Sequence, residues 1–100
     1  MNPHSQFLHD QRKHFLRRLR ERFNLYMPTD YYNLLCQHMD SAPILAQLYG
    51  GLSTIRKIKY QKKTIRVLFD ERYRKIDTCL PEDVSIKEFI QKQPHVAISN

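Results

Sequence analysis

Glycine is scarce in this sequence, at 2 of 100 residues, and no apolar run approaches the ~18 residues that a membrane-spanning helix needs. Apolar residues still make up 41% of the chain, which is typical of a globular protein and argues against disorder throughout. Residues 1–13 are polar and lack the apolar centre of a signal peptide. We therefore expect a single domain over residues 1–100, located in the cytoplasm and without a membrane segment.

Cysteine is rare as well, and the motifs of metal and cofactor sites are missing. Cys36 and Cys79 are far apart and fit no metal-binding spacing, so we expect two buried thiols in a reducing cytosol. The sequence has no Gly-rich phosphate loop, no zinc pattern and no nucleophile elbow. Its carboxylates are scattered, whereas a two-metal site needs a cluster. We therefore expect no metal and no cofactor.

Acidic residues are the third shortage, with 10 against 17 lysines and arginines and a net charge of +7. The excess is local: residues 1–30 hold six basic side chains against three acids, and residues 53–75 hold nine against two. Residues 76–100 instead carry more acids than bases. Net charge indicates partners and not fold. A polyanion such as a nucleic acid would therefore meet the first helix and the strands, and not the tail.

Residues 5–23 show the periodicity of an amphipathic helix with one apolar stripe. The stripe consists of Leu8, Phe15, Leu16, Leu19 and Phe23. Arg12 falls inside this stripe, so either its stem snorkels outward or the packed part of the helix begins near Lys13. Arg17 and Glu21, on the polar face, are four residues apart and should pair weakly.

A second helix is predicted after the first one ends at Asn24. It should span residues 29–39, with Thr29 as its N-cap. Pro43 interrupts this pattern, and a further helical turn is expected over residues 44–49.

Three strand-like runs follow, over about 53–60, 63–70 and 73–80. In the middle run Ile65, Val67 and Phe69 recur at every second position and should line one face. We expect that face to pack against Phe15 and Leu19 of the first helix. Other residues expected on this inner face are Ile58, Tyr60, Ile76, Thr78 and Leu80. The short connections predict an antiparallel meander.

The tail over residues 82–100 leaves two alternatives open. Either Ser85 caps a short helix over residues 85–92, or a last strand runs through residues 95–98. The predicted fold class is α+β, with two N-terminal helices packed on a small antiparallel β-meander of three or four strands.

A basic sheet face is the first candidate site. Lys57, Lys59, Arg66 and Lys75 can share the face opposite the apolar one. Arg17 and Arg18, on the polar face of the helix, are further candidates for nucleic-acid contact. A concentrated cationic surface attracts phosphates and releases counterions on binding. Tyr60 and Tyr73 lie close to these basic residues in the sequence and are candidates for stacking on unpaired bases. The alternative interpretation is an ordinary solvated face of a basic protein.

His14 and Thr78 are the second set of candidates. His14 lies beside arginines on the polar helix face, where a histidine could transfer a proton during phosphodiester cleavage. Thr78 could hold a phosphate by a hydrogen bond. A surface histidine and a β-branched strand residue on the inner face are the simpler interpretations.

The stretch from about His14 to Pro81 resembles the barnase–EndoU–colicin–RelE group of small RNases and toxins. The residues that carry the resemblance are the basic helix with Glu21-Arg22-Phe23, then Asp30-Tyr31, the strand Ile65-Arg66-Val67-Leu68-Phe69-Asp70 and the ending Thr78-Cys79-Leu80-Pro81. The resemblance implies two helices on a small antiparallel sheet and metal-independent RNA cleavage. In it His14 would be the helix histidine, Arg66 the middle-strand arginine and Thr78 the last-strand threonine. Lys57 or Lys59 would be the first-strand cation.

The sequence departs from that pattern in three ways. Asp77 puts a negative charge beside Thr78, and the sheet offers no second well-placed histidine. Alternation also places Arg66 and Thr78 on opposite faces unless a bulge intervenes. A non-catalytic relative therefore stays an alternative.

These observations favour a cytoplasmic RNA-binding domain, whose catalytic form would be a toxin-like or prophage-encoded, metal-independent endoribonuclease. A toxin would need a neutralising partner, which we expect to be acidic. The alternative is a non-enzymatic interaction protein of a phage or mobile element that binds a host protein or DNA.

Overall fold

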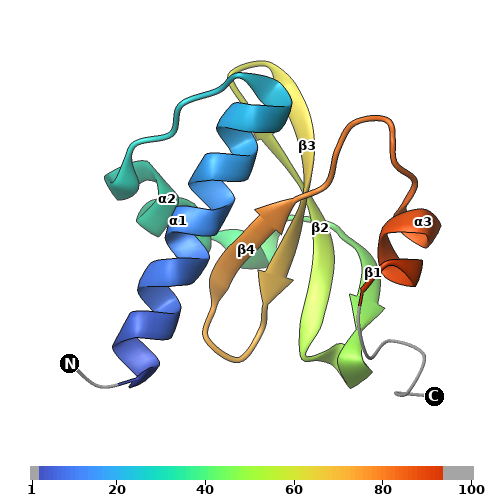
Figure 1. Cartoon of the computed structure of the whole chain (residues 1–100), viewed down its shortest axis with the longest axis horizontal. Helices are drawn as coiled ribbons and strands as arrows, with labels where there is room; N and C mark the ends of the chain where they lie inside the picture. The colour runs from blue at the N-terminus through green and yellow to red at the C-terminus, as the bar shows by residue number, and fades with distance from the viewer. Residues whose placement is uncertain (1–2, 94–100) are drawn as a thin grey trace.

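Four antiparallel strands form one sheet in the order β1-β2-β3-β4, with helices on both faces (Figure 1). The computed structural model describes residues 3–93, and side chains from Asp10 onward. The elements are α1 (Pro3–Phe23), α2 (Thr29–Gln37), η1 (Met39–Ser41), β1 (Ile44–Leu48), η2 (Tyr49–Gly51), β2 (Ser53–Tyr60), β3 (Lys63–Asp70), β4 (Lys75–Cys79) and α3 (Ile86–Gln91). The predicted α+β class, with helices packed on a β-meander, is confirmed.

The main core lies between the sheet and the first two helices. Phe15 and Leu19 of α1 are fully buried in the same cluster as three residues of β3, namely Ile65, Val67 and Phe69. This packing was predicted from the two periodicities and is confirmed. The predicted buried thiols, Cys36 and Cys79, lie in this cluster and are unpaired. Burial raises the pKa of Cys79 to about 11 although the charge of Arg22 acts against it.

A second, smaller core covers the opposite face of the sheet beneath α3. It contains Leu48, Ile55, Leu68, Leu80 and Phe89. The second core explains why Leu68 breaks the alternation of its strand: its side chain packs under α3, so apolar residues are needed on both faces of β3. Of the two alternatives for the tail, the helix capped by Ser85 is observed. The alternative strand 95–98 lies outside the described residues.

A bulge in β4 changes which residues face the helices. Leu68 lies opposite Thr78 and Phe69 lies opposite Ile76, so Asp77 is an extra residue in β4. Beyond it the pleat is reversed, and Leu80 joins the α3 core. The prediction of Thr78 and Leu80 on the helix-facing side was therefore wrong, because sequence alternation does not reveal a bulge. The bulge also places Arg66 and Thr78 on one face.

Several boundaries differ from those expected. Residues 44–48 form a strand and not a helical turn, because they pair with β2 once the chain has passed Pro43. The N-cap of α2 is Pro28 without a side-chain hydrogen bond, so Thr29 already belongs to the helix. Asn24 ends α1 in the left-handed region, with φ of 55°. Gln11, and not the half-buried Arg12, occupies the buried stripe, where its Nε2 donates to Asp70 at 3.1 Å.

Candidate nucleic-acid interface

His14 lies half-buried on α1, against the free edge of β4. Its Nδ1 is 3.0 Å from the carbonyl oxygen of Asp77, and its Nε2 is 3.4 Å from Nε of Arg18. Because a carbonyl only accepts, Nδ1 must carry the ring hydrogen and Nε2 must accept from Arg18. This arrangement uses both ring nitrogens of His14.

Arg66 lies on the other side of the sheet and is bound to main chain. Its Nη2 donates to the carbonyl oxygens of Pro81 at 2.7 Å and Val84 at 2.6 Å, with Glu82 at 3.4 Å. The guanidinium therefore fastens the connection between β4 and α3. An arginine used in this way keeps its charge, but the hydrogens of its Nη2 are already engaged.

Thr78 is buried, at 7% exposure, opposite Leu68 on the α3 side of the sheet. The bulge thus brings Thr78 and Arg66 to one face, whereas His14 bonds to the edge of β4 from α1. Each of the three predicted catalytic side chains is directed at a different neighbour. The catalytic role of these three side chains remains a prediction, and their separate positions do not favour it.

The helix arginines share one carboxylate. Arg17 lies 3.6 Å from Glu21, which was the predicted pair, and Arg18 lies 3.3 Å from the same group. Both contacts are at the surface and are worth little in water. Arg17 is the more exposed of the two arginines, so it is the one available to a phosphate.

Lys75 lies at the start of β4, on the opposite end of the sheet from the β2–β3 turn, and directly across from Asp70. It lines a hollow of about 480 Å³ together with Asn33 and Tyr73. Lys75 is therefore separated from Lys57 and Lys59, and the predicted cations do not form one continuous surface.

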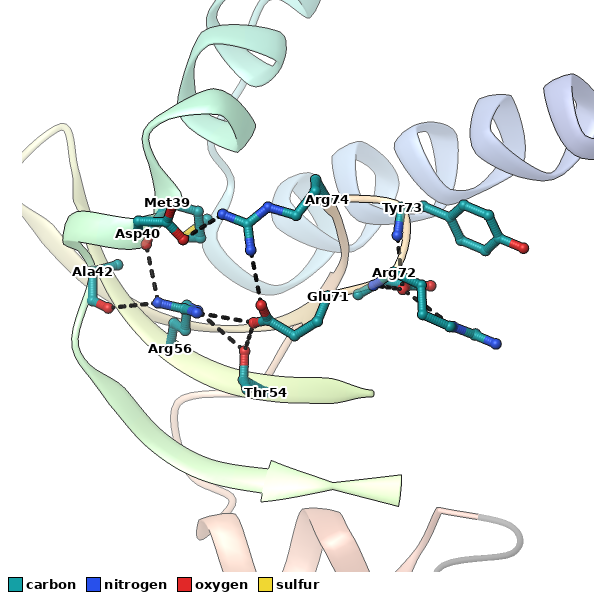
Figure 2. A network of polar contacts seen from close by, with 10 residues as sticks. Met39, Asp40, Ala42, Thr54, Arg56, Glu71, Arg72, Tyr73 and Arg74 are labelled. Atoms are coloured by element: carbon teal, nitrogen blue, oxygen red, sulfur yellow. Dashed lines mark hydrogen bonds and ion pairs between the residues drawn. The ribbon is translucent and has the colours of Figure 1, made fainter. Parts of the chain in front are cut away.

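Arg56 was counted among the cations of the basic stretch, but it is buried at the centre of a polar network (Figure 2). Its Nη1 donates to the carbonyl oxygens of Met39 at 3.2 Å and Ala42 at 3.0 Å. Nη2 lies 2.9 Å from Glu71, and Nε donates to Thr54 at 3.1 Å. Arg56 thus fixes the segment that leads into β1.

The network continues outward from Glu71. Arg74 donates to Glu71 at 2.8 Å and contacts Asp40 (Figure 2). Its guanidinium lies 4.8 Å from the ring centre of Phe69. Burial alone would raise the pKa of Glu71, but hydrogen bonds from Thr54 and Arg56 and the nearby cationic charges lower it overall. Together with Arg66, Arg56 and Arg74 make three of the nine basic side chains in residues 53–75 that hold the fold.

The outer half of β2, Lys57–Tyr60, extends beyond its pairing with β1 and is called here the open segment. The amide of Lys57 donates to Pro43 at 3.1 Å, so its backbone faces away from β3. Residues two apart in a strand face the same way, so the backbone of Lys59 also faces outward. The first residue of β1, Ile44, lies opposite Arg56, so β1 does not extend as far as Lys59. Lys59 therefore presents backbone groups beyond the end of β1.

A groove of about 250 Å³ runs between this open segment and the C-terminal end of α2. Lys57 and Lys59 line one side, and Leu35 and His38 line the other. Both lysines are exposed, and neither forms an ion pair with any residue of the described range 3–93. Their charges therefore have no carboxylate partner among these residues, unlike the charge of Arg56, which is paired with Glu71.

Tyrosines gather at the same end of the molecule. The predicted stacking residue Tyr60 is buried at 6%, and its hydroxyl donates to the carbonyl oxygen of Tyr26 at 2.8 Å. Tyr31 contacts the Tyr60 ring at a centroid distance of 5.1 Å. Tyr26 and Tyr31 are exposed at 72% and 41%. The ring faces available to a ligand are therefore those of Tyr26 and Tyr31, which the sequence did not single out.

No family model, curated protein or solved structure matches this chain. Within residues 3–93 no group of three or more His, Cys, Asp or Glu side chains could hold a metal ion. In the same range no helix is long and apolar enough to cross a bilayer.

Proposed function

We propose that this protein binds single-stranded RNA through the surface formed by the open segment of β2 and the adjoining tyrosines. The observation that supports it most is a pair of exposed lysines along a groove, Lys57 and Lys59, which form no ion pair with the described part of the chain. Lysines of this kind contact phosphates, and neighbouring aromatic rings stack on unpaired bases. Tyr26 and Tyr31 supply such rings.

A single strand fits this surface better than a duplex. Bases can stack on a tyrosine only when their faces are not covered by neighbouring pairs. The outward amide of Lys59 adds a donor for a phosphate oxygen next to the side-chain charge. The binding that we propose requires no residue of the predicted catalytic set to change its partners.

The test is the affinity for a fluorescent single-stranded RNA of about ten nucleotides, within the usual site size of such surfaces. Replacement of both lysines, Lys57→Ala with Lys59→Ala, should weaken binding about tenfold or more. Because two phosphate contacts are lost, the slope of log K against log salt should become shallower by about 1.4.

The matched control removes two exposed lysines near α3, Lys87→Ala with Lys92→Ala, which gives the same change in net charge. This control should bind as the parent does. Equal loss in both double variants would mean that only the total charge matters and would contradict the interface. A parent that binds duplex RNA or DNA as tightly as single-stranded RNA would contradict the strand preference.

Stacking is tested separately from charge at Tyr26, the more exposed ring. Tyr26→Ala should weaken RNA binding by roughly 1–3 kcal/mol, the usual value for one stacked base, whereas Tyr26→Phe should retain it. Equal affinities of these two variants would exclude stacking at this position.

Metal-independent cleavage is a separate hypothesis on the same protein. If the protein cleaves RNA in excess EDTA, His14→Ala and Arg66→Ala should each slow it by about a hundredfold, the usual scale for such groups. The comparison must use equal folded concentrations, because Arg66 also holds the connection to α3. No cleavage by the parent would leave binding as the whole activity.

A further inference from the structure

The outer edge of β1 differs from the rest of the surface in having no charge. Residues 41–55, which include all of β1, contain no Lys, Arg, His, Asp or Glu, in a chain with a net charge of +7. Three large apolar side chains are exposed there, Ile44 at 49%, Leu45 at 39% and Leu52 at 46%. This neutral, apolar strip lies at the end of the sheet opposite to β4 (Figure 1).

The backbone of β1 is also open at this edge. Ala46 lies opposite Ile55, and Leu48 lies opposite Ser53. The backbone of Lys57 faces Pro43, and residues two apart in a strand face the same way, so the backbones of Ile55 and Ser53 face β1. Gln47, between them, must then direct its amide and carbonyl away from β2. No hydrogen bond to these two groups comes from any residue between 3 and 93. Unpaired strand groups of this kind are the usual template for adding a further strand.

We propose that β1 pairs with β1 of a second copy of this chain, antiparallel, with Gln47 facing Gln47 across a twofold axis. An edge that meets itself in this way is self-complementary, as symmetric dimers require. The two sheets would then join into one continuous sheet, and Ile44 and Leu45 of each copy would be covered at the junction.

Charge selects the second copy over other occupants. A nucleic acid or an acidic peptide would find no cation between residues 41 and 55. Two copies of a chain with a charge of +7 repel each other over most of their surface, and this strip is where they can approach without like charges in contact. The open segment of β2 is less suitable for self-pairing, because it would oppose Lys57 and Lys59 to their own copies.

The proposed dimer should respond to salt in the opposite direction to RNA binding. Added salt screens the repulsion between the two positive copies, so dimerisation should strengthen between about 50 and 500 mM salt. Binding of RNA to Lys57 and Lys59 should weaken over the same range. The two associations are therefore distinguishable by the sign of their response to salt.

The test is sedimentation equilibrium of the full chain and of two charge variants, Gln47→Lys and Gln47→Glu. Each variant alone places like charges opposite each other and should dimerise at least tenfold more weakly than the parent. A mixture of the two variants should restore the dimer, because opposite charges then face each other. The matched controls, Gln37→Lys and Gln37→Glu on the exposed face of α2, should dimerise as the parent does.

A parent that stays monomeric at all concentrations and salt levels would overturn the proposal and leave this edge to a different polypeptide. A dimer that both Gln47 variants retain would overturn the location. Loss of the dimer in each variant without restoration in the mixture would overturn the antiparallel pairing about Gln47. Circular dichroism of each variant establishes that the fold is intact.

Discussion

β1 and β4 are the two outer strands of the same sheet. Among the described residues, side chains cover the outer edge of β4 but not that of β1. His14 and Arg22 of α1 donate to the carbonyl oxygens of Asp77 and Cys79, and Tyr32 of α2 donates to Ile76 at 2.7 Å. Polar residues of both helices therefore occupy the acceptors that an added strand would use. The edge of β1 has no such cover between residues 3 and 93.

The contrast between the two edges shows that some basic side chains hold the fold and are not available to a ligand. Arg22, Arg56 and Arg66 all donate to main-chain carbonyls, so they contribute to the net charge and hold the fold at the same time. Lys57 and Lys59 form no such bonds with any residue of the range 3–93. A high net charge therefore overstates the cationic surface that is available to a ligand. We expect the free lysines to govern binding and the arginines to govern stability.

The largest effect is expected from Arg56, which fixes the segment in front of the open edge. Arg56→Ala removes one of the donors to Glu71 and the side-chain donor to the carbonyls of Met39 and Ala42 (Figure 2). Loss of one partner of a buried ion pair typically costs ~3–5 kcal/mol. Urea unfolding should show this loss, whereas the neighbouring Lys57→Ala should change the free energy of unfolding by no more than ~0.5 kcal/mol.

The same network has a predictable response to acid. The pKa of Glu71 is lower in the folded protein, so its contribution to stability is present above its ordinary pKa and is lost as the pH falls through the folded pKa. Glu71→Gln should be less stable than the parent near neutral pH, and the difference should shrink in acid. A difference that does not change with pH would mean that the carboxylate charge is not what stabilises the network.

A smaller effect is expected when the closed edge of β4 is opened. Arg22→Ala removes the donor to Cys79 and should cost ~1–3 kcal/mol, the usual penalty for an unsatisfied polar group. The exposed Arg20 on the same helix is the control, because Arg20→Ala removes the same charge. Amide hydrogen exchange should rise in β4 for the first variant and not for the second. Equal exchange in both would show that the edge does not depend on Arg22.

The sequence predicted the main elements of the fold because each depends on local periodicity. The stripe of α1 and the alternation of β3 were sufficient to predict that Phe15 packs with Val67. Leu68 is an exception to the alternation of β3, and only the position of α3 explains why an apolar residue is needed there. The strand at 44–48 was missed because a short apolar run without alternation has no distinct period.

The candidate site was harder to predict for a different physical reason. His14 and Arg66 were chosen for their chemistry, but their hydrogen bonds go to residues 63 and 15–18 positions away in sequence, which no local pattern reveals. Lys57 and Lys59 were placed correctly on β2, because alternation and charge are both local. The exposure of Tyr26 depends on how the loop after α1 meets the β2–β3 turn, and that contact is tertiary.

The smallest effect concerns Asp77, the extra residue in the closed edge. Burial raises the pKa of its carboxyl, the charge of His14 lowers it, and that of Asp70 raises it, with a net increase above the ordinary value of 3.8. A raised folded pKa means that folding favours the protonated form. The stability that this provides is complete below the ordinary pKa and is lost as the pH rises through the folded pKa.

At neutral pH the ionised Asp77 therefore costs stability that a neutral amide would not. Asp77→Asn should stabilise the protein by about 0.5 kcal/mol near pH 7, and the advantage should vanish in acid, where Asp77 itself becomes neutral. The control is Asp83→Asn, an exposed position after β4 for which no such difference is expected. The measurement is the urea midpoint of parent and variants at several pH values. An advantage of Asp77→Asn that persists in acid would show that the amide stabilises the bulge by a new hydrogen bond and not by removing a charge.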